Sequence, residues 1–197
     1  MHSELVRRQL YRRIQDADRN HHAQLHELFR NKQFHTILHK NGIRCELVEH
    51  TGRARTLDIA VVFKYFDKNS EGIHKYCVMQ NVCIFNYGQL KCFNLYGPEE
   101  DVRLREPYEP SRFEIWRRLT SSFREFVDVK YGHVLNSNQL IQQQCFLRAA
   151  LKAFTENCAI CQEHLKDFLP PTYMRGSCDE FEKKPELVHN ECRRMAR

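Results

Sequence analysis

The stretch TLDIAVVFKYF, residues 56–66, decides the fold that we expect for this chain. It is rich in β-branched and aromatic residues, which favour strands, and its centre from Ile59 to Phe63 is entirely apolar. An uninterrupted apolar centre indicates a strand covered on both faces, and we expect helices to supply that cover. The sequence therefore predicts a buried strand around which the other elements pack.

Similar runs lie on both sides of this strand. Upstream, Lys40-Asn41-Gly42 separates FHTIL (34–38) from IRCELVE (43–49), which is a favourable hairpin signal. Downstream, IHKYCVMQNVCIFN (73–86) and QLKCFNLY (89–96) follow after short polar breakers. Short connections between strand-like runs predict an antiparallel meander of about four or five strands over residues 34–96.

Helical patterns lie outside this predicted sheet. Residues 1–32 are expected to form an amphipathic helix, because apolar and small side chains recur every three or four positions at Leu10, Ile14, Ala17, His21, Leu25 and Leu28. This helix either packs on its own domain or serves as a coiled-coil strand for a partner. Two further helices are expected at 111–131 and 139–155, with Ser111 as N-cap and Glu114 completing a capping box.

The composition limits the possible classes of protein. The 197 residues are 42% hydrophobic and 28% charged, which suits one globular domain with a helical extension. The net charge of +6 is concentrated at the N-terminus, where residues 1–44 carry nine Lys/Arg against four Asp/Glu, while residues 158–197 carry seven of each. Nine cysteines without a secretory signal indicate free thiols and metal ligands in a reducing compartment. No run approaches the ~18 apolar residues of a membrane span.

Two cysteine-bearing half-sites near the C-terminus predict a metal centre. Cys158 and Cys161 form a CxxC directly after the last predicted helix, and His189 and Cys192 form an HxxC, with 27 residues between Cys161 and His189. A tight turn and a helical turn would each direct two donors to one point, and a Cys₃His set suits Zn²⁺. Because all four positions are filled by protein, the site would be structural.

Two other residues compete with His189 as the fourth ligand. His164 lies close to the CxxC, but it is expected to face solvent on a helix that begins there. Cys178 lies among acidic, turn-like residues. Both alternatives stay open at the level of sequence.

Enzyme signatures are absent, since the sequence contains no GxGxxG, GxxxxGK[ST], HExxH or GxSxG motif. We therefore expect a binding protein and no enzymatic activity. Two other classes compete with this interpretation. One is a zinc-containing nucleic-acid-binding protein that uses the basic N-terminal helix, and the other is an enzyme with a Cys/His or zinc-hydroxide centre.

The order of motifs in the second half of the chain carries a family resemblance. FEIW (113–116), a helix that runs into CAIC (158–161), Leu-Pro-Pro-Thr-Tyr (169–173) and LVHNECRR (187–194) occur in sequence. This arrangement resembles the C-terminal half of Mediator complex subunit 27. The resemblance covers about residues 25–197 and is firmest from residue 111 onward. Family members carry a long N-terminal helical region, in place of which this chain has only the helix near residues 3–31.

The resemblance implies a nuclear structural subunit of the Mediator coactivator, which bridges regulators and RNA polymerase II. It implies a place in the tail module near its junction with the core, and other Mediator subunits as partners. No small-molecule substrate, membrane association or direct nucleic-acid binding is expected. Combined with the residue patterns, it predicts an α+β protein with an N-terminal helix (1–32), an α+β domain (33–155) and a zinc-bound tail (156–197), whose exposed aromatic residues are candidates for partner contact: Phe168, Tyr173 and Phe181.

Overall fold

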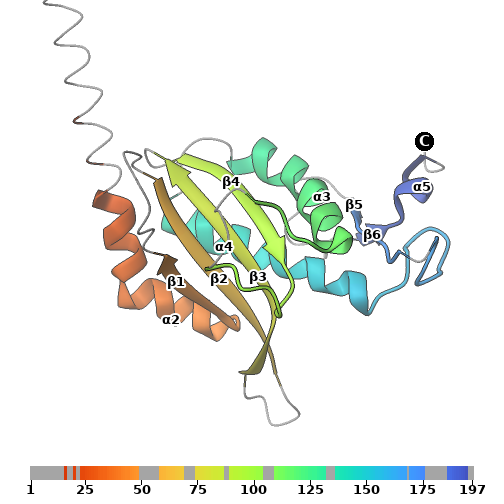
Figure 1. Ribbon diagram of the computed structural model, residues 1–197, viewed down its shortest axis with the longest axis horizontal. Coiled ribbons are helices and arrows are strands. Elements are labelled where there is room, and N and C mark those ends of the chain that lie inside the picture. Colours follow the sequence, from red (N-terminus) through yellow and green to blue (C-terminus); the bar gives the residue numbers. More distant parts are fainter. Residues whose placement is uncertain are drawn as a thin grey trace, which may run out of the picture.

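A computed structural model of the chain shows helices packed against a four-stranded antiparallel sheet, which confirms the predicted α+β class (Figure 1). It describes residues 16, 20, 23–48, 58–68, 74–86, 89–103, 109–131, 136–167, 169–175 and 186–194. The sheet has the order β1-β2-β3-β4, and a separate two-stranded sheet pairs β5 with β6. The elements are α2 (Lys32–Lys40), β1 (Ile43–Val48), β2 (Asp58–Lys68), β3 (His74–Asn86), β4 (Gln89–Tyr96), α3 (Glu114–Tyr131), α4 (Ser137–Leu147), the 3₁₀ helix η1 (Arg148–Phe154), β5 (Tyr173–Arg175), β6 (Glu186–Val188) and α5 (Asn190–Arg193).

The segment predicted as the first strand is the helix α2, so the strand prediction for FHTIL is wrong. The Asn31 side chain caps this helix by accepting hydrogen bonds from two backbone N–H groups of its first turn, at 2.8 and 3.2 Å. Phe34 and Leu38, four residues apart, are both buried on the side that faces the sheet. Gly42 has a φ of 69°, directly after the C-cap residue. The Asn-Gly pair therefore ends a helix here instead of turning a hairpin.

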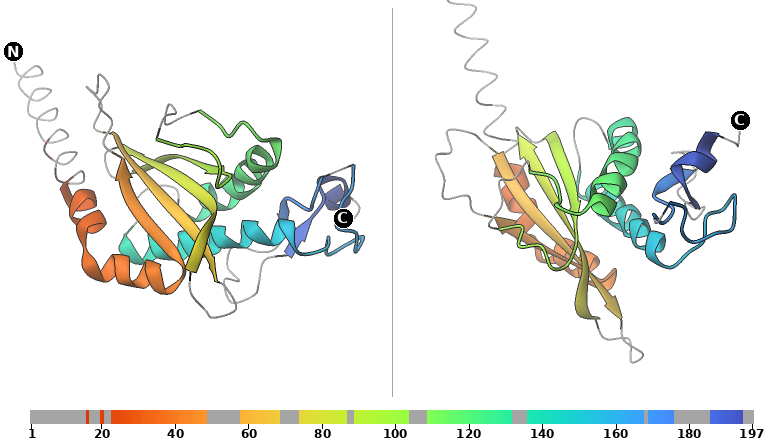
Figure 2. Two further views of the ribbon diagram at one scale, coloured as in Figure 1. Left: turned by 60° about the horizontal axis from the view of Figure 1, so that its bottom comes forward. Right: turned by 45° about the vertical axis from the view of Figure 1, so that its right-hand side comes forward.

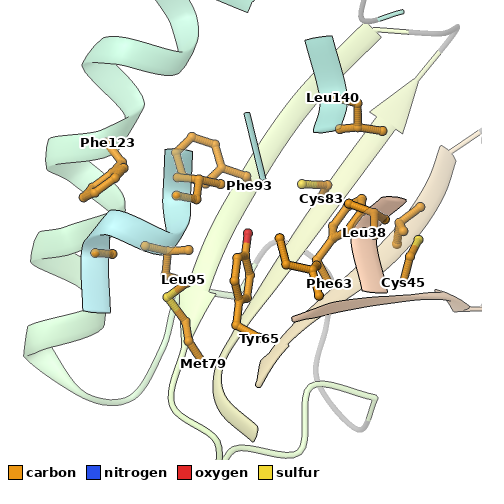
Figure 3. Packing of buried hydrophobic residues seen from close by; sticks show 14 of the residues in the cluster. Leu38, Cys45, Phe63, Tyr65, Met79, Cys83, Phe93, Leu95, Phe123 and Leu140 are labelled. Carbon is orange, nitrogen blue, oxygen red and sulfur yellow. The ribbon is translucent and has the colours of Figure 1, made fainter. Parts of the chain in front are cut away.

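The main core lies between one face of the sheet and the helices (Figures 2 and 3). Alternate residues of β2 point to this face, because side chains alternate along a strand: Ile59, Val61, Phe63 and Tyr65. Four helices contribute buried residues to the same cluster: Phe34 and Leu38 from α2, Trp116, Leu119 and Phe123 from α3, Leu140 and Leu147 from α4, Ala150 and Ala153 from η1. One continuous core thus joins the sheet to α4 and η1, the two elements that precede the predicted metal centre.

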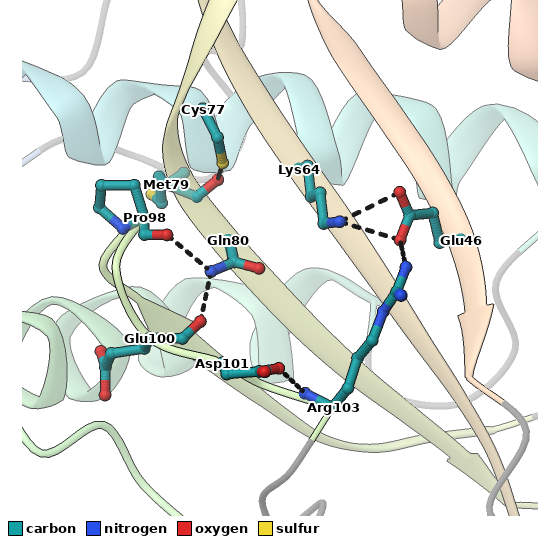
Figure 4. Close-up of polar contacts among 9 residues, drawn as sticks. All are labelled: Glu46, Lys64, Cys77, Met79, Gln80, Pro98, Glu100, Asp101 and Arg103. Carbon is teal, nitrogen blue, oxygen red and sulfur yellow. Dashed lines mark hydrogen bonds and ion pairs between the residues drawn. The ribbon is translucent and has the colours of Figure 1, made fainter.

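The opposite face of the sheet is covered in part by the segment that follows β4. A smaller cluster of buried side chains lies there: Val62, Val82, Tyr96 and Val102. The Gln80 amide holds the segment in place by donating to the carbonyl of Glu100 at 2.8 Å (Figure 4). It also donates to the carbonyl of Gly97 at 3.0 Å. Among the described residues, helices cover only the first face, so the expectation of helices on both faces is correct for one face.

An ion-pair cluster ties the covering segment to the edge of the sheet (Figure 4). Lys64 Nζ lies 3.0 Å from Glu46 Oε2, and Arg103 Nη2 lies 2.6 Å from the same oxygen. Partial burial alone would raise the pKa of the Glu46 carboxyl, but the hydrogen bonds from Lys64 and Arg103 outweigh it and hold the pKa below its ordinary value. The ionised form of Glu46 is therefore stabilised in the folded protein.

A buried carboxylate takes the place of the capping box predicted before α3. Glu100, which is 3% exposed, accepts a hydrogen bond from the Ser111 hydroxyl at 2.6 Å and from the backbone N–H of Arg112 at 3.1 Å. The Glu114 side chain instead binds Arg118, one helical turn further on. The Ser111 hydroxyl also accepts a hydrogen bond from the backbone N–H of Phe113 at 3.1 Å, so Ser111 and Glu100 together hold the start of α3.

The second predicted helix forms as two successive pieces, α4 and η1. A capping box of Asn136 and Gln139 starts α4. At its centre the Gln144 side chain enters the core, where its Oε1 accepts hydrogen bonds from Tyr65 Oη at 2.7 Å and from Asn81 Nδ2 at 2.9 Å. All three side chains are buried. A buried polar cluster therefore connects α4 to the two central strands.

The described part of the predicted N-terminal helix packs on its own domain. Residues 23–30 are helical, and Leu25 and Phe29 are buried in the main core. The remainder of the helix predicted at 1–32 lies outside the described residues, apart from residues 16 and 20, and the three segment boundaries stay predictions. Among the described residues, no helix has both the length and the apolar character needed to cross a membrane.

Candidate metal centre

The first predicted half-site is a tight turn directly after η1. Cys158 donates its backbone N–H to the carbonyl of Glu163 at 2.9 Å, and its own carbonyl accepts from the N–H of Gln162 at 2.9 Å. Gln162 has a φ of 61°, so the chain reverses sharply just after Cys161. No helix begins at the CxxC in the structure, because residues 162–167 form turns and irregular chain. The expectation of a helix carrying His164 there is wrong.

The second half-site is returned to this turn by the β5–β6 hairpin (Figures 1 and 2). The backbone N–H of Ala159 donates to the carbonyl of Leu187 at 3.0 Å, which joins the CxxC turn to β6. His189 follows β6 as the N-cap residue of α5, and Cys192 lies within α5. The hairpin therefore brings two pairs of donors that are distant in sequence to one end of the molecule.

The four predicted ligand residues converge on one point. One donor atom from each of Cys158, Cys161, His189 and Cys192 lies within 4.8 Å of the other three. His189 Nδ1 is 3.4 Å from Cys161 Sγ and 4.0 Å from Cys192 Sγ. Sulfur and nitrogen ligands of one zinc ion stand about 3.6 Å apart in a tetrahedron, given bonds of about 2.3 and 2.05 Å. The donor set thus fits a tetrahedral metal ion, and the cluster could bind one.

The surroundings orient the His189 ring for this geometry. Its Nε2 lies 3.4 Å from the carbonyl oxygen of His164, which only a protonated Nε2 can satisfy as a donor. The lone pair is then on Nδ1, the nitrogen that faces the sulfurs of Cys161 and Cys192. A backbone carbonyl on the far nitrogen is the usual partner of a metal-binding histidine. His164 therefore supports the site through its backbone, and its own ring lies against the carbonyl of Glu156 at 3.2 Å.

The thiols of Cys158 and Cys192 have opposite pKa shifts, because their surroundings differ. Burial alone would raise the pKa of Cys158, but backbone N–H groups, including that of His189 at 3.4 Å, donate to its sulfur and lower the pKa to about 6. Burial and the neighbouring sulfurs of Cys161 and Cys158 raise the pKa of Cys192 to about 11. The positive charge of a bound divalent cation would offset the repulsion between the sulfurs and favour the deprotonated thiols.

The other residues considered at the sequence level do not join this cluster. Cys178, Phe168 and Phe181 lie outside the described residues. Tyr173 is half-buried beside the site and packs beneath the Arg193 guanidinium, 3.9 Å from its ring centre. The carbonyl of His164 could not have been found from the sequence, because backbone acceptors carry no residue signature.

The remaining described cysteines lie within strands and helices and form no disulfide: Cys45, Cys77, Cys83, Cys92 and Cys145. Burial raises the pKa of Cys83 to about 12, so this thiol stays protonated.

The fold and the site together define an α+β protein whose C-terminal segment is organised around a Cys₃His cluster. Residues 105–193 match the model of the family described as Mediator complex subunit 27. This match supports the family resemblance predicted from the sequence. The match extends from just before α3 to Arg193 and includes all four residues of the cluster. No curated protein matches the chain.

The matched family implies a role as a Mediator subunit in transcription, with other Mediator subunits as partners. Mediator is a nuclear complex, and this family consists of structural and regulatory subunits. The sheet, β1 to β4, precedes the matched region.

Proposed function

We propose that the protein is a structural subunit of the Mediator tail module, located in the nucleus, which helps to bridge regulators and RNA polymerase II by holding other subunits. The observation that carries this proposal is the convergence of Cys158, Cys161, His189 and Cys192 within the region that matches the Mediator family. The role is mechanical, and no catalytic step is assigned to any residue.

The ligand set supports Zn²⁺ as the resident ion. Three sulfurs and one imidazole nitrogen are the donors that structural zinc sites use, and four protein ligands complete its coordination. Zn²⁺ in such a site supplies folding energy without redox chemistry or an open position for substrate. Cys158, Cys161, His189 and Cys192 are therefore the proposed ligands.

The cluster fixes a segment that has little core of its own. The buried hydrophobic residues around it are Cys158, Val188 and Cys192, of which two are proposed ligands. Leu187 is the residue of β6 that enters the main core. Full burial of one such side chain contributes about 1.5–3 kcal/mol, whereas a structural zinc site contributes on the order of 10 kcal/mol. Metal binding is therefore the main cause of order in this segment.

A groove beside the segment is the proposed contact surface for a neighbouring subunit. It has a volume of about 840 Å³ and lies between the start of α3 and the end of η1. Phe113 and Phe154 line it and are 36% and 43% exposed, and the Trp116 ring lies 5.1 Å from that of Phe154. Exposed aromatic side chains around a concave surface are typical of protein contacts. An apolar segment of another Mediator subunit is the proposed occupant.

Affinity purification of the tagged full chain from nuclei, followed by mass spectrometry, tests the proposal. Mediator subunits should co-purify in stoichiometric amounts with the wild type. Phe154→Ser should reduce this yield, while Leu165→Ser, which is also exposed but outside the groove, should not. Purification without Mediator subunits would refute the function. Equal yields for both variants would refute the groove alone.

A further inference from the structure

A second hollow, of about 310 Å³, lies between α3 and the C-terminal segment. Every described residue that lines it offers an N–H or O–H donor, and none of these residues is acidic. The lining residues come from α3 (Arg118, Ser121 and Ser122), from the chain at the start of β5 (Thr172 and Tyr173) and from α5 (Asn190 and Arg193). Three segments that are distant in sequence thus contribute donors to one cavity.

The walls of this hollow are held by packing. Ser122 and Thr172 are each 7% exposed, and α3 contacts β5 directly (Figure 1). The Arg193 guanidinium stacks 3.9 Å above the centre of the Tyr173 ring. Stacking covers one face of a guanidinium, and its N–H groups lie in the plane of the group. The hollow is therefore a shaped and positively charged site.

From this arrangement we propose that the hollow binds the phosphate group of a phosphoserine or phosphothreonine on a protein partner. A phosphate monoester carries a charge of about −1.5 to −2 and three acceptor oxygens, which matches two arginines and three hydroxyls better than the two oxygens of a carboxylate do. The small volume accommodates one phosphorylated side chain. A nucleic-acid strand would need a longer basic track with stacking platforms, and residues 158–197 have equal numbers of acidic and basic side chains.

Arg118 already pairs with the carboxylate of Glu114, which binds a guanidinium less strongly than a phosphate dianion does. Its Nε and Nη2 donate to Glu114 Oε1 at 2.9 and 2.7 Å, on the surface of α3. An exposed pair of this kind contributes about 0.2–1 kcal/mol, so a dianion can compete for the guanidinium. Neutralising Glu114 should then strengthen phosphate binding, which is the opposite of what loss of a structural contact would do.

Binding at this site also depends on the C-terminal segment, since Asn190 and Arg193 lie in α5 with Cys192. The proposal therefore rests on the metal-organised segment, and zinc content is measured in parallel for every variant. Phosphate binding with full zinc content but without Mediator co-purification would separate this site from the proposed function.

NMR titration of the ¹⁵N-labelled full chain tests the proposal, with N-acetyl-phosphoserine methylamide as the probe at constant ionic strength. Saturable shifts should appear at the amides of Ser122 and Thr172. Arg118→Gln and Arg193→Gln should weaken binding by about tenfold or more, because a hydrogen bond to a charged group contributes about 1.5–3 kcal/mol. Glu114→Gln should tighten binding.

The matched control is Arg112→Gln, an exposed arginine outside the hollow, and it should leave binding unchanged. Equal shifts with acetate, or equal weakening by the control, would overturn the site. Saturation by inorganic phosphate without binding of the phosphoserine probe, or tighter binding of a single-stranded DNA oligonucleotide, would overturn the assignment to a phosphorylated protein.

Discussion

Replacement of one sulfur in the Cys₃His cluster gives the sharpest test of the proposed zinc centre. Cys158 is 0% exposed, and its sulfur accepts a backbone hydrogen bond from His189 at 3.4 Å. Structural zinc sites contribute about 10–16 kcal/mol in apparent binding energy. An equal share for each of four ligands is about 2.5–4 kcal/mol, so Cys158→Ser should weaken zinc binding by roughly 10²–10³-fold.

Chelator competition with the purified full chain measures this change, with bound zinc determined by elemental analysis. Hydrogen exchange on the same samples should show lost protection in residues 158–167 and 186–194 and unchanged protection in β2 and β3. Cys77→Ser is the matched control, because this half-buried thiol belongs to β3 and donates to the carbonyl of Met79 at 3.3 Å. It should retain zinc at wild-type affinity.

Two results would refute the reasoning. If Cys158→Ser retains one equivalent of zinc with less than tenfold loss of affinity, Cys158 is not a ligand. If the sheet loses protection together with the C-terminal segment, the metal supports the whole domain and not the segment alone.

The remaining predictions concern stability, measured as the free energy of unfolding in urea. Gly42→Ala should cost about 1–2 kcal/mol, because its φ of 69° is strained for a residue with a Cβ. Leu119→Ala should cost about 2–5 kcal/mol, because the side chain is 0% exposed in the main core. The lowered pKa of Glu46 contributes stability that is present above its ordinary pKa of 4.5 and is lost as pH falls through the lower folded value. Glu46→Gln should therefore remove about 0.5 kcal/mol at neutral pH and flatten the stability profile below pH 4.5. A Gly42→Ala protein as stable as wild type, an unchanged midpoint for Leu119→Ala, or an unchanged acid profile for Glu46→Gln would contradict the respective argument.

The error at α2 shows where local patterns are ambiguous. Thr36 and Ile37 are β-branched and favour a strand, while Phe34 and Leu38 are spaced for one face of a helix. Asn-Gly at 41–42 fits both a hairpin and a helix end. Packing of Phe34 and Leu38 on the sheet decides between the two, and packing depends on residues far away in the sequence. The α+β class and the antiparallel order of β1 to β4 were predicted because those strands are joined in sequence order.

The two half-sites of the metal centre could be predicted because each is a short motif with its own spacing. Their pairing was predicted because together they complete the donor set of one zinc ion, whereas the β5–β6 hairpin that brings them together was not predicted. The hollow between α3 and the C-terminal segment gave no signal in the sequence, since Arg118, Thr172 and Arg193 are ordinary polar residues until three segments come together. A site assembled from single residues of separate elements is visible only in the folded chain.

The hydrogen bonds of the Gln144 side-chain amide fix the position of α4 along the sheet. Its oxygen accepts hydrogen bonds from side chains of two different strands, Tyr65 of β2 and Asn81 of β3. A slide of α4 by one turn, about 5.4 Å, would place Leu140 or Arg148 there and leave two buried donors unpaired, at a cost of about 1–3 kcal/mol each. η1 and then the Cys158 turn follow α4 in the chain. The fixed position of α4 therefore also determines the position of this turn relative to α3.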